Sequence, residues 1–467
     1  MRRAALGLVG ALAAAPAVLF FAFPTFPQYD SYFHLVWGRM VLHGAKPDFE
    51  AYAAPTEHPL YVAIGGLLSL LGTDAGERAM VALTLLSLSA LVVATWRVGE
   101  RLFGTWPGAV ASAFVGTSFA FLLYAVRAYV DVPFLALVAW AAVLAISERR
   151  VAVMALLALA GLLRPEAWVL AGLWWLWTVR AGPRAILTLL AASAPVLWAV
   201  VDGVVTGDPL HSLHATSSLA ENLGRTRGLR HVPGSLVSFL SEVARPPVAL
   251  LGVAGVVLAL RRWPWRRLAV PLALLACGLV TFVGTGIAGL SILPRYLTVP
   301  VVSLCLFGGY ALAGFTTLEP GHPWRRRWRD AAVVATALGL VFVAIKAPSF
   351  NKLRDELSFV HHAHDDLVAM LQTRAVRAGA RCGPITYPNY RLVPDTRWLL
   401  DLPARRVGAR SAKRHPYGVE MFVLGVKALK RYGFAAGAST LTNVPDPDYV
   451  LAAHNRTFAA YVRCPAR

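Results

Sequence analysis

The chain alternates long apolar runs with short polar segments. The first run begins at Ala4 and ends at Phe23. Ten more lie near residues 79–97, 106–124, 130–147, 150–163, 166–180, 185–205, 247–260, 268–288, 294–314 and 331–347. An apolar helix of about 20 residues crosses the ~30 Å hydrocarbon core of a bilayer. The pattern therefore predicts an all-α polytopic membrane protein with eleven transmembrane helices.

The N-terminal run resembles a secretory signal, because Met1-Arg2-Arg3 precedes it. The apolar part of a signal peptide has 7–15 residues, however, and this run has about 20. We interpret it as an uncleaved first span with its N-terminus in the cytoplasm.

A further apolar run, residues 59–72, has about 14 residues and is too short to cross as a helix. If it lies in the outer interface, every arginine cluster falls on the cytoplasmic side, as positive-inside sorting requires. The clusters are Arg2-Arg3, Arg97 with Arg101, Arg149-Arg150, Arg180 with Arg184, Arg261 to Arg267, and Arg325 to Arg329. We therefore expect the C-terminus to lie outside the cytoplasm.

This topology gives a membrane domain, residues 1–347, with outer loops at 24–78, 125–131 and 206–246. Residues 348–467 then form an extracytoplasmic domain. That region contains a helical pattern near 352–378 and alternating stretches at 384–387 and 449–452, which indicate a small α/β fold. Cys382 and Cys464 lie within it and could pair in an oxidising compartment.

Composition agrees with a membrane protein, since 57% of the residues are hydrophobic and only 15% are charged. The net charge of +20 fits cytoplasmic arginines better than nucleic-acid binding, because no basic patch is interleaved with aromatic residues. No glycine-rich nucleotide loop or Walker sequence is present, so we expect no nucleotide cofactor.

Several charged residues lie at the predicted outer ends of spans, where charges are costly. Asp30 follows the first span and Asp131 opens the fourth; either carboxylate could simply cap a helix. Glu57 and His58 could ligate a metal or face water. The arginines at this side could bind a phosphate as a guanidinium fork or reach toward lipid phosphates; they are Arg127, Arg164 and Arg295.

Together these motifs resemble the GT-C superfamily of membrane glycosyltransferases, in its protein mannosyltransferase-like and lipid A aminoarabinose transferase-like branch. The matches are Tyr29-Asp30, Gly44-x-x-Pro47, Glu57-His58-Pro59-Leu60-Tyr61, Arg101-Leu102-Phe103-Gly104, Asp131, Leu163-Arg164-Pro165 and Arg295-Tyr296. They cover residues 5–315. The departure is His58-Pro59-Leu60, where the family often has two prolines before the leucine.

The resemblance implies a polyprenyl-phosphate sugar as donor. The richness in Ala, Arg, Gly, Leu and Val suggests a high-GC bacterium, so we expect a plasma-membrane protein with a cell-envelope glycan, lipid or protein as acceptor. Asp30 corresponds to the catalytic base and Asp131 to the second carboxylate of the superfamily. Arg127, Arg164, Arg295 and Tyr296 would bind the donor phosphate. A divalent metal would be held by Glu57 and His58, completed by His211 or His214.

We expect Asp30, Glu57, Asp131 and Arg295 to line one cavity at the outer interface. A transporter or flippase for a lipid-linked sugar is the alternative, although its mid-membrane charges and repeated halves are absent from the sequence. A non-catalytic membrane scaffold is the third hypothesis.

Overall fold

The computed structural model describes residues 2–22, 25–433 and 440–466 of the chain, and it is mostly helical. The helices that correspond to the predicted apolar runs are α1 (Arg2–Ala22), α4 (Thr73–Phe103), α5 (Thr105–Gly116), α6 (Phe119–Val126), α7 (Asp131–Ile146), α8 (Arg150–Gly161), α9 (Glu166–Thr178), α10 (Arg184–Thr206), α13 (Pro246–Arg262), α14 (Ala269–Ile287), α15 (Thr298–Ala313), which η3 (Gly314–Thr317) extends, and α16 (Pro323–Lys346). Every predicted run is therefore helical.

Judged by length and composition, fewer helices can cross a membrane than the eleven that the sequence predicts. Among the described residues, six helices are long and apolar enough to cross a membrane, or up to eight if two bent pairs each count as one span. The runs that became α7, α8 and α9 form helices of only 16, 12 and 13 residues. The length of an apolar run in the sequence overestimates the length of these helices, because the helices end at turns that contain Glu148, Arg164 and Gly182.

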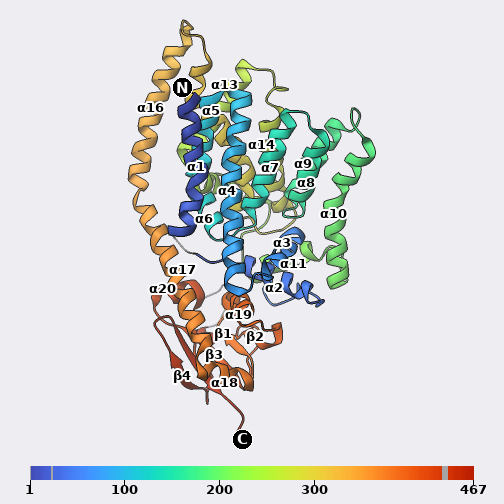
Figure 1. The fold of residues 1–467 in the computed structure, drawn as a ribbon, viewed down its shortest axis with the longest axis vertical. Coiled ribbons are helices and arrows are strands. Elements are labelled where there is room, and N and C mark those ends of the chain that lie inside the picture. The colour runs from blue at the N-terminus through green and yellow to red at the C-terminus, as the bar shows by residue number, and fades with distance from the viewer. Residues whose placement is uncertain (1, 23–24, 434–439, 467) are drawn as a thin grey trace.

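The bundle is built around α15. In the continuous helical segment Pro294–Thr317 that contains it, 94% of the residues in the most apolar stretch are buried. Close approach by α13 requires glycine, because a Cβ at Gly255 would collide with the backbone of Phe307. At the edges, α16 and α10 stand on opposite sides of the bundle (Figure 1). Only 6% of the residues in the most apolar stretch of α16 are buried. The exposed apolar side chains of such edge helices suit a lipid environment.

Short elements cluster at the end of the bundle opposite the N-terminus (Figure 1). They are α2 (Tyr29–Leu42), α3 (Pro59–Ser69), α11 (His211–Asn222), η1 (Leu229–His231), α12 (Val232–Val243) and η2 (Pro294–Leu297). The ambiguous run at 59–72 is thus an 11-residue helix, α3, at the same end as the C-terminal domain. Its position relative to the membrane surface stays a prediction.

The C-terminal domain carries a mixed five-stranded sheet with the order β2-β1-β3-β5-β4. Its elements are α17 (Pro348–Gln372), α18 (Arg374–Cys382), β1 (Ile385–Tyr387), η4 (Tyr390–Leu392), α19 (Val393–Leu400), η5 (Ala404–Arg406), β2 (Val407–Ala409), β3 (Gly418–Val423), α20 (Val426–Ala428), the π-turn η6 (Leu429–Gly433), η7 (Thr440–Asn443), β4 (Val450–His454) and β5 (Phe458–Arg463). Strand β1 runs parallel to β2 and β3, whereas β5 runs antiparallel to β3 and β4. The small α/β fold expected from the sequence is therefore present.

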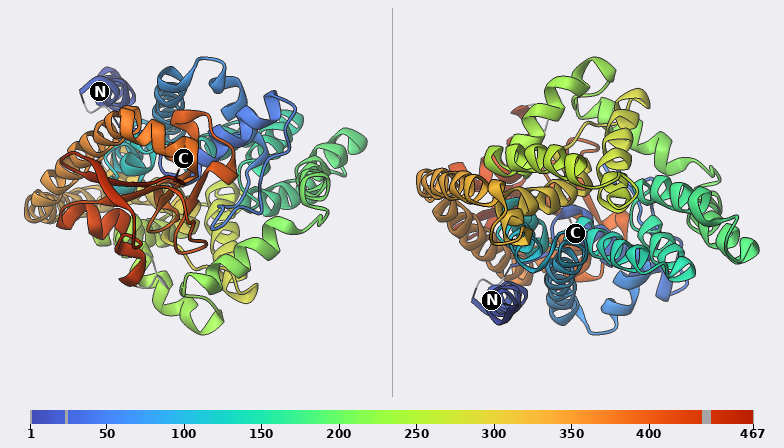
Figure 2. Two further views of the ribbon diagram at one scale, coloured as in Figure 1. Left: turned by 90° about the horizontal axis from the view of Figure 1, so that it is seen from below. Right: turned by 90° about the horizontal axis from the view of Figure 1, so that it is seen from above.

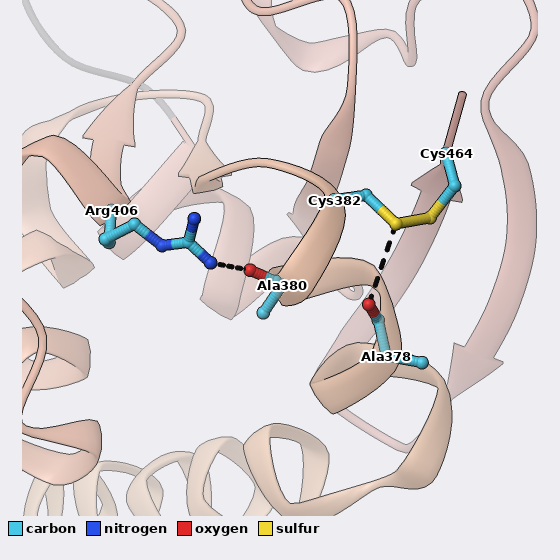
Figure 3. The surroundings of a disulfide bond; sticks show 5 residues. All are labelled: Ala378, Ala380, Cys382, Arg406 and Cys464. Atoms are coloured by element: carbon cyan, nitrogen blue, oxygen red, sulfur yellow. Dashed lines mark hydrogen bonds between the residues drawn. A yellow bond between two sulfur atoms is a disulfide. The ribbon is translucent and has the colours of Figure 1, made fainter.

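A disulfide joins Cys382 at the end of α18 to Cys464 after β5, as predicted (Figure 3). Their Cα atoms are 5.3 Å apart and 82 positions separate them in sequence. The bond ties the last strand of the domain to the helix that precedes its first strand. Cys277 and Cys305 are free and buried in the bundle.

The C-terminal domain covers the centre of the bundle when the molecule is seen from below (Figure 2). Arg397 of α19 is fully buried and pairs with Asp48 through Nη1 and Nη2, at 2.8 and 3.2 Å. Beside it, the guanidinium of Arg39 stacks over the ring of Trp398 and donates to two carbonyls of α19. These contacts hold α19 against α2 and fix the domain over the end of the bundle.

Candidate active site

A cavity of about 720 Å³ lies between the end of the bundle and the C-terminal domain. The membrane part contributes residues from α2, the 53–56 turn, the 124–129 loop, α11 and η2. The C-terminal domain contributes residues from α17, η4, α19, α20 and η6. Its walls carry seven Lys or Arg side chains and three Asp or Glu side chains. The charge of the cavity is therefore strongly positive, which favours an anionic ligand.

Asp30 and Arg295 share one wall of this cavity, as the sequence-based hypothesis required. Asp30 lies in the first turn of α2 and Arg295 lies in η2, 265 positions later. Arg295 Nη1 donates to Asp30 Oδ2 at 3.3 Å, and each side chain is about a quarter exposed. Tyr296 lines the same wall. A carboxylate and a guanidinium group therefore lie side by side on the cavity wall, and both are partly exposed.

Arg127 also lines the cavity, at the end of the short helix α6. Its side chain is only 9% exposed, and its buried Nη1 has no hydrogen-bond partner among the residues that the structure describes. A buried guanidinium donor left unpaired is costly, so this atom is available to a ligand.

The C-terminal domain adds cavity residues that sequence reasoning missed. These include Tyr390, Arg391, Asp395, Lys427, Lys430 and Arg431. Burial raises the pKa of the Asp395 carboxyl to about 7, while Arg127 acts in the opposite direction. The cluster of basic residues from Lys427 to Arg431 is evident in the sequence, but its position over the cavity depends on how the C-terminal domain docks on the bundle.

Asp131 and Arg164 do not line the cavity, contrary to our expectation for Asp131. Asp131 is fully buried and pairs with Arg164, which also donates to Glu166 through Nη2 at 2.6 Å. The guanidinium of Arg164 thus lies between two carboxylates. The carboxylate at the start of α7 is covered by Arg164, which lies in the turn between α8 and α9, and the sequence does not report that depth.

Glu57 does not line the cavity either, which is a second departure from the expected cluster. It is 1% exposed, and Ser212 Oγ lies 2.8 Å from Glu57 Oε1 and 2.7 Å from Asp202 Oδ2. Burial, followed by the adjacent Asp202, raises the pKa of Glu57 to about 8. This buried carboxyl pair ties the 50–58 loop to α10 and α11.

The four residues expected to hold a metal do not form one set of ligands. His58 stacks on His34, with ring centroids 5.1 Å apart, while the exposed His214 pairs with Asp208 at 2.6 Å. The buried Nε2 of His211 has no hydrogen-bond partner in the described part of the chain. Among residues 2–22, 25–433 and 440–466, no three His, Cys, Asp or Glu side chains are grouped so as to hold a metal ion.

No protein-family model matches the sequence, and no curated protein matches it significantly. Solved structures do match. ArnT from Cupriavidus metallidurans bound to undecaprenyl phosphate is 14% identical, with a TM-score of 0.58 over 97% of this chain and 98% of that chain. The Archaeoglobus fulgidus oligosaccharyltransferase tethered to an acceptor peptide is 11% identical, with a TM-score of 0.53 over 86% of this chain and 63% of that chain. AglB from the same organism, in complex with an inhibitory peptide and a dolichol-phosphate, matches equally well.

ArnT and AglB both belong to the GT-C superfamily. The ArnT match covers nearly the whole chain, so the likeness extends beyond residues 5–315 and into the C-terminal domain. Because the identities are only 11% to 14%, the likeness shows a shared fold.

Proposed function

Because the chain has the GT-C fold, we propose that it is a membrane glycosyltransferase. It moves a hexosyl or pentosyl group from a polyprenyl phosphate to a hydroxyl group of an extracytoplasmic acceptor, with inversion at the anomeric carbon. The acceptor is a glycan, lipid or protein of the cell envelope. The structural neighbours support a lipid phosphate, since one is bound to undecaprenyl phosphate and another to a dolichol-phosphate.

The observation that carries this proposal is the pairing of Asp30 with Arg295 on the wall of one cavity. Transfer of a sugar from a lipid phosphate needs a base for the acceptor and a cation for the leaving group. These two side chains supply both at adjacent positions. The first residues of one candidate span, Pro294–Thr317, line the cavity, which supports a ligand whose prenyl tail remains in lipid.

The reaction proceeds as a single displacement. The acceptor oxygen attacks the anomeric carbon while Asp30 takes the hydroxyl proton. The bond between that carbon and the phosphate oxygen breaks, and its electron pair remains on the polyprenyl phosphate. Arg295 stabilises the charge that grows on this oxygen. One displacement inverts the anomeric configuration.

Asp30→Asn tests the proposal, because asparagine has the same size but cannot accept the proton. Membranes that contain the full-length protein and the native acceptors are supplied with radiolabelled polyprenyl-phosphate hexoses and pentoses. We expect transfer into envelope material to fall about 10²- to 10⁴-fold, the usual contribution of a general base. Binding of undecaprenyl phosphate should persist.

The matched control is Glu221→Gln, an exposed acid on α11 that lies outside the cavity. It should transfer sugar at the rate of the unmodified protein. Full transfer by Asp30→Asn would refute the proposed base. Movement of labelled lipid across the bilayer without any transfer would instead support a transporter.

A further inference from the structure

Arg127 has a like-charged neighbour on the opposite side of the domain boundary. After burial, the charge of Arg431 has the largest effect on Arg127 and lowers its pKa. Arg127 belongs to the membrane part and Arg431 to η6 of the C-terminal domain. Both line the cavity, and no ion pair of Arg127 is found in the described part of the chain.

The acids nearest this pair do not neutralise it. Glu356 contacts Arg431 at 2.5 Å but is also shared with Lys427 at 3.6 Å. Asp395 lines the same cavity, but burial raises its pKa to about 7, so it is only partly ionised near neutral pH. Lys430 adds a further cation to the same wall. Positive charge therefore exceeds negative charge on this side of the cavity.

Two guanidinium groups facing one cavity repel each other more strongly in a poorly solvated site than in water. An anion between them would remove this cost and would satisfy the unpartnered Nη1 of Arg127. Phosphate suits such a site, because its oxygens accept hydrogen bonds from several donors at once. The site would exist only with the C-terminal domain docked.

We propose that Arg127, Lys430 and Arg431 form a phosphate subsite across the domain boundary, which binds the phosphate of the polyprenyl lipid. The C-terminal domain thus completes the lipid site rather than merely covering it. This inference rests on the proposed function and adds residues to its donor site.

Arg431→Gln and Lys430→Gln test the subsite in the full-length protein, reconstituted in nanodiscs. Undecaprenyl phosphate is the probe, and undecaprenol, which lacks the phosphate, is the reference. The unmodified protein should prefer the phosphate form, and preference should decline with salt. Arg431→Gln should weaken binding of the phosphate form about 10-fold or more, with no change for undecaprenol.

Two controls separate ligand binding from a structural role. Glu356→Gln breaks the ion pair of Arg431 but leaves its cation free, so affinity for undecaprenyl phosphate should stay equal or rise. If Arg431 only stabilised the fold, both substitutions would lower affinity. Arg405→Gln, an exposed residue of the same domain outside the cavity, should change nothing.

Unchanged affinity in Arg431→Gln and Lys430→Gln would overturn the subsite while leaving the glycosyltransferase proposal intact. Equal affinity of the unmodified protein for undecaprenyl phosphate and undecaprenol would instead contradict the proposed function itself.

Discussion

Asp48→Ala should release the C-terminal domain from the bundle far more readily than Asp401→Ala, although both remove an aspartate from the same interface. Asp48 pairs with Arg397, whose side chain is 1% exposed, and it also accepts from Trp37 Nε1 at 3.0 Å. Asp401 pairs with Arg39 at 3.0 Å but is itself 73% exposed.

The expected magnitudes follow from burial. Loss of Asp48 leaves the Arg397 guanidinium buried without its counter-ion, which costs about 3–5 kcal/mol. A loss of about 3 kcal/mol raises the open fraction about 100-fold. The exposed pair of Asp401 contributes at most about 1 kcal/mol, less than a 10-fold change. Replacement of both buried partners, as in Asp48→Asn with Arg397→Met, should be milder than Asp48→Ala.

Cysteine labelling measures the opening. Leu357 of α17 is 5% exposed and packs with the core of the bundle, so a Leu357→Cys background places a thiol where a maleimide reaches it only on opening. The labelling rate should rise about 100-fold in Asp48→Ala and less than 10-fold in Asp401→Ala. Equal, small changes in both variants would refute the view that the buried ion pair docks the domain.

Three further predictions concern stability. The pKa of Glu57 is raised to about 8, so the folded state binds more protons than the unfolded state between about pH 4.5 and 8. Thermal stability should therefore fall as the pH rises through this window. Glu57→Gln should abolish that part of the decline. Reduction of the Cys382–Cys464 disulfide should destabilise the C-terminal domain by about 4–5 kcal/mol in the chain-entropy model, visible as faster proteolysis. Asp131→Ala should lower stability by about 3 kcal/mol, the low end of the range for breaking a buried ion pair, because the buried Arg164 keeps only Glu166 as a partner; detergent-solubilised protein should melt earlier.

The sequence predicts the helices well, because an apolar run in lipid must satisfy its backbone hydrogen bonds internally and therefore becomes helical. It also predicts the disulfide, since Cys382 and Cys464 are the two cysteines of the polar C-terminal region. Proximity of Asp30 to Arg295 could not be derived from spacing, and only the family resemblance suggested it.

The sequence pattern predicts neither how deeply a charged side chain is buried nor how the C-terminal domain docks on the bundle. Asp30 follows an apolar run and Asp131 opens one, both at the predicted outer side. Asp131 is nevertheless fully buried, whereas Asp30 faces the cavity. The difference depends on which helices pack beside them. Lys430 and Arg431 resemble any basic surface segment until α19 is docked against α2 and brings their domain over the cavity.

The most direct measurement is a density map of the full-length Asp30→Asn variant with undecaprenyl phosphate. We predict that the phosphate lies in the cavity between the bundle and the C-terminal domain, within hydrogen-bonding distance of Arg295 and of Arg127. The prenyl chain should extend from it along the membrane-spanning helices. A phosphate bound outside this cavity, away from position 30 and Arg295, would contradict the proposed glycosyltransferase mechanism.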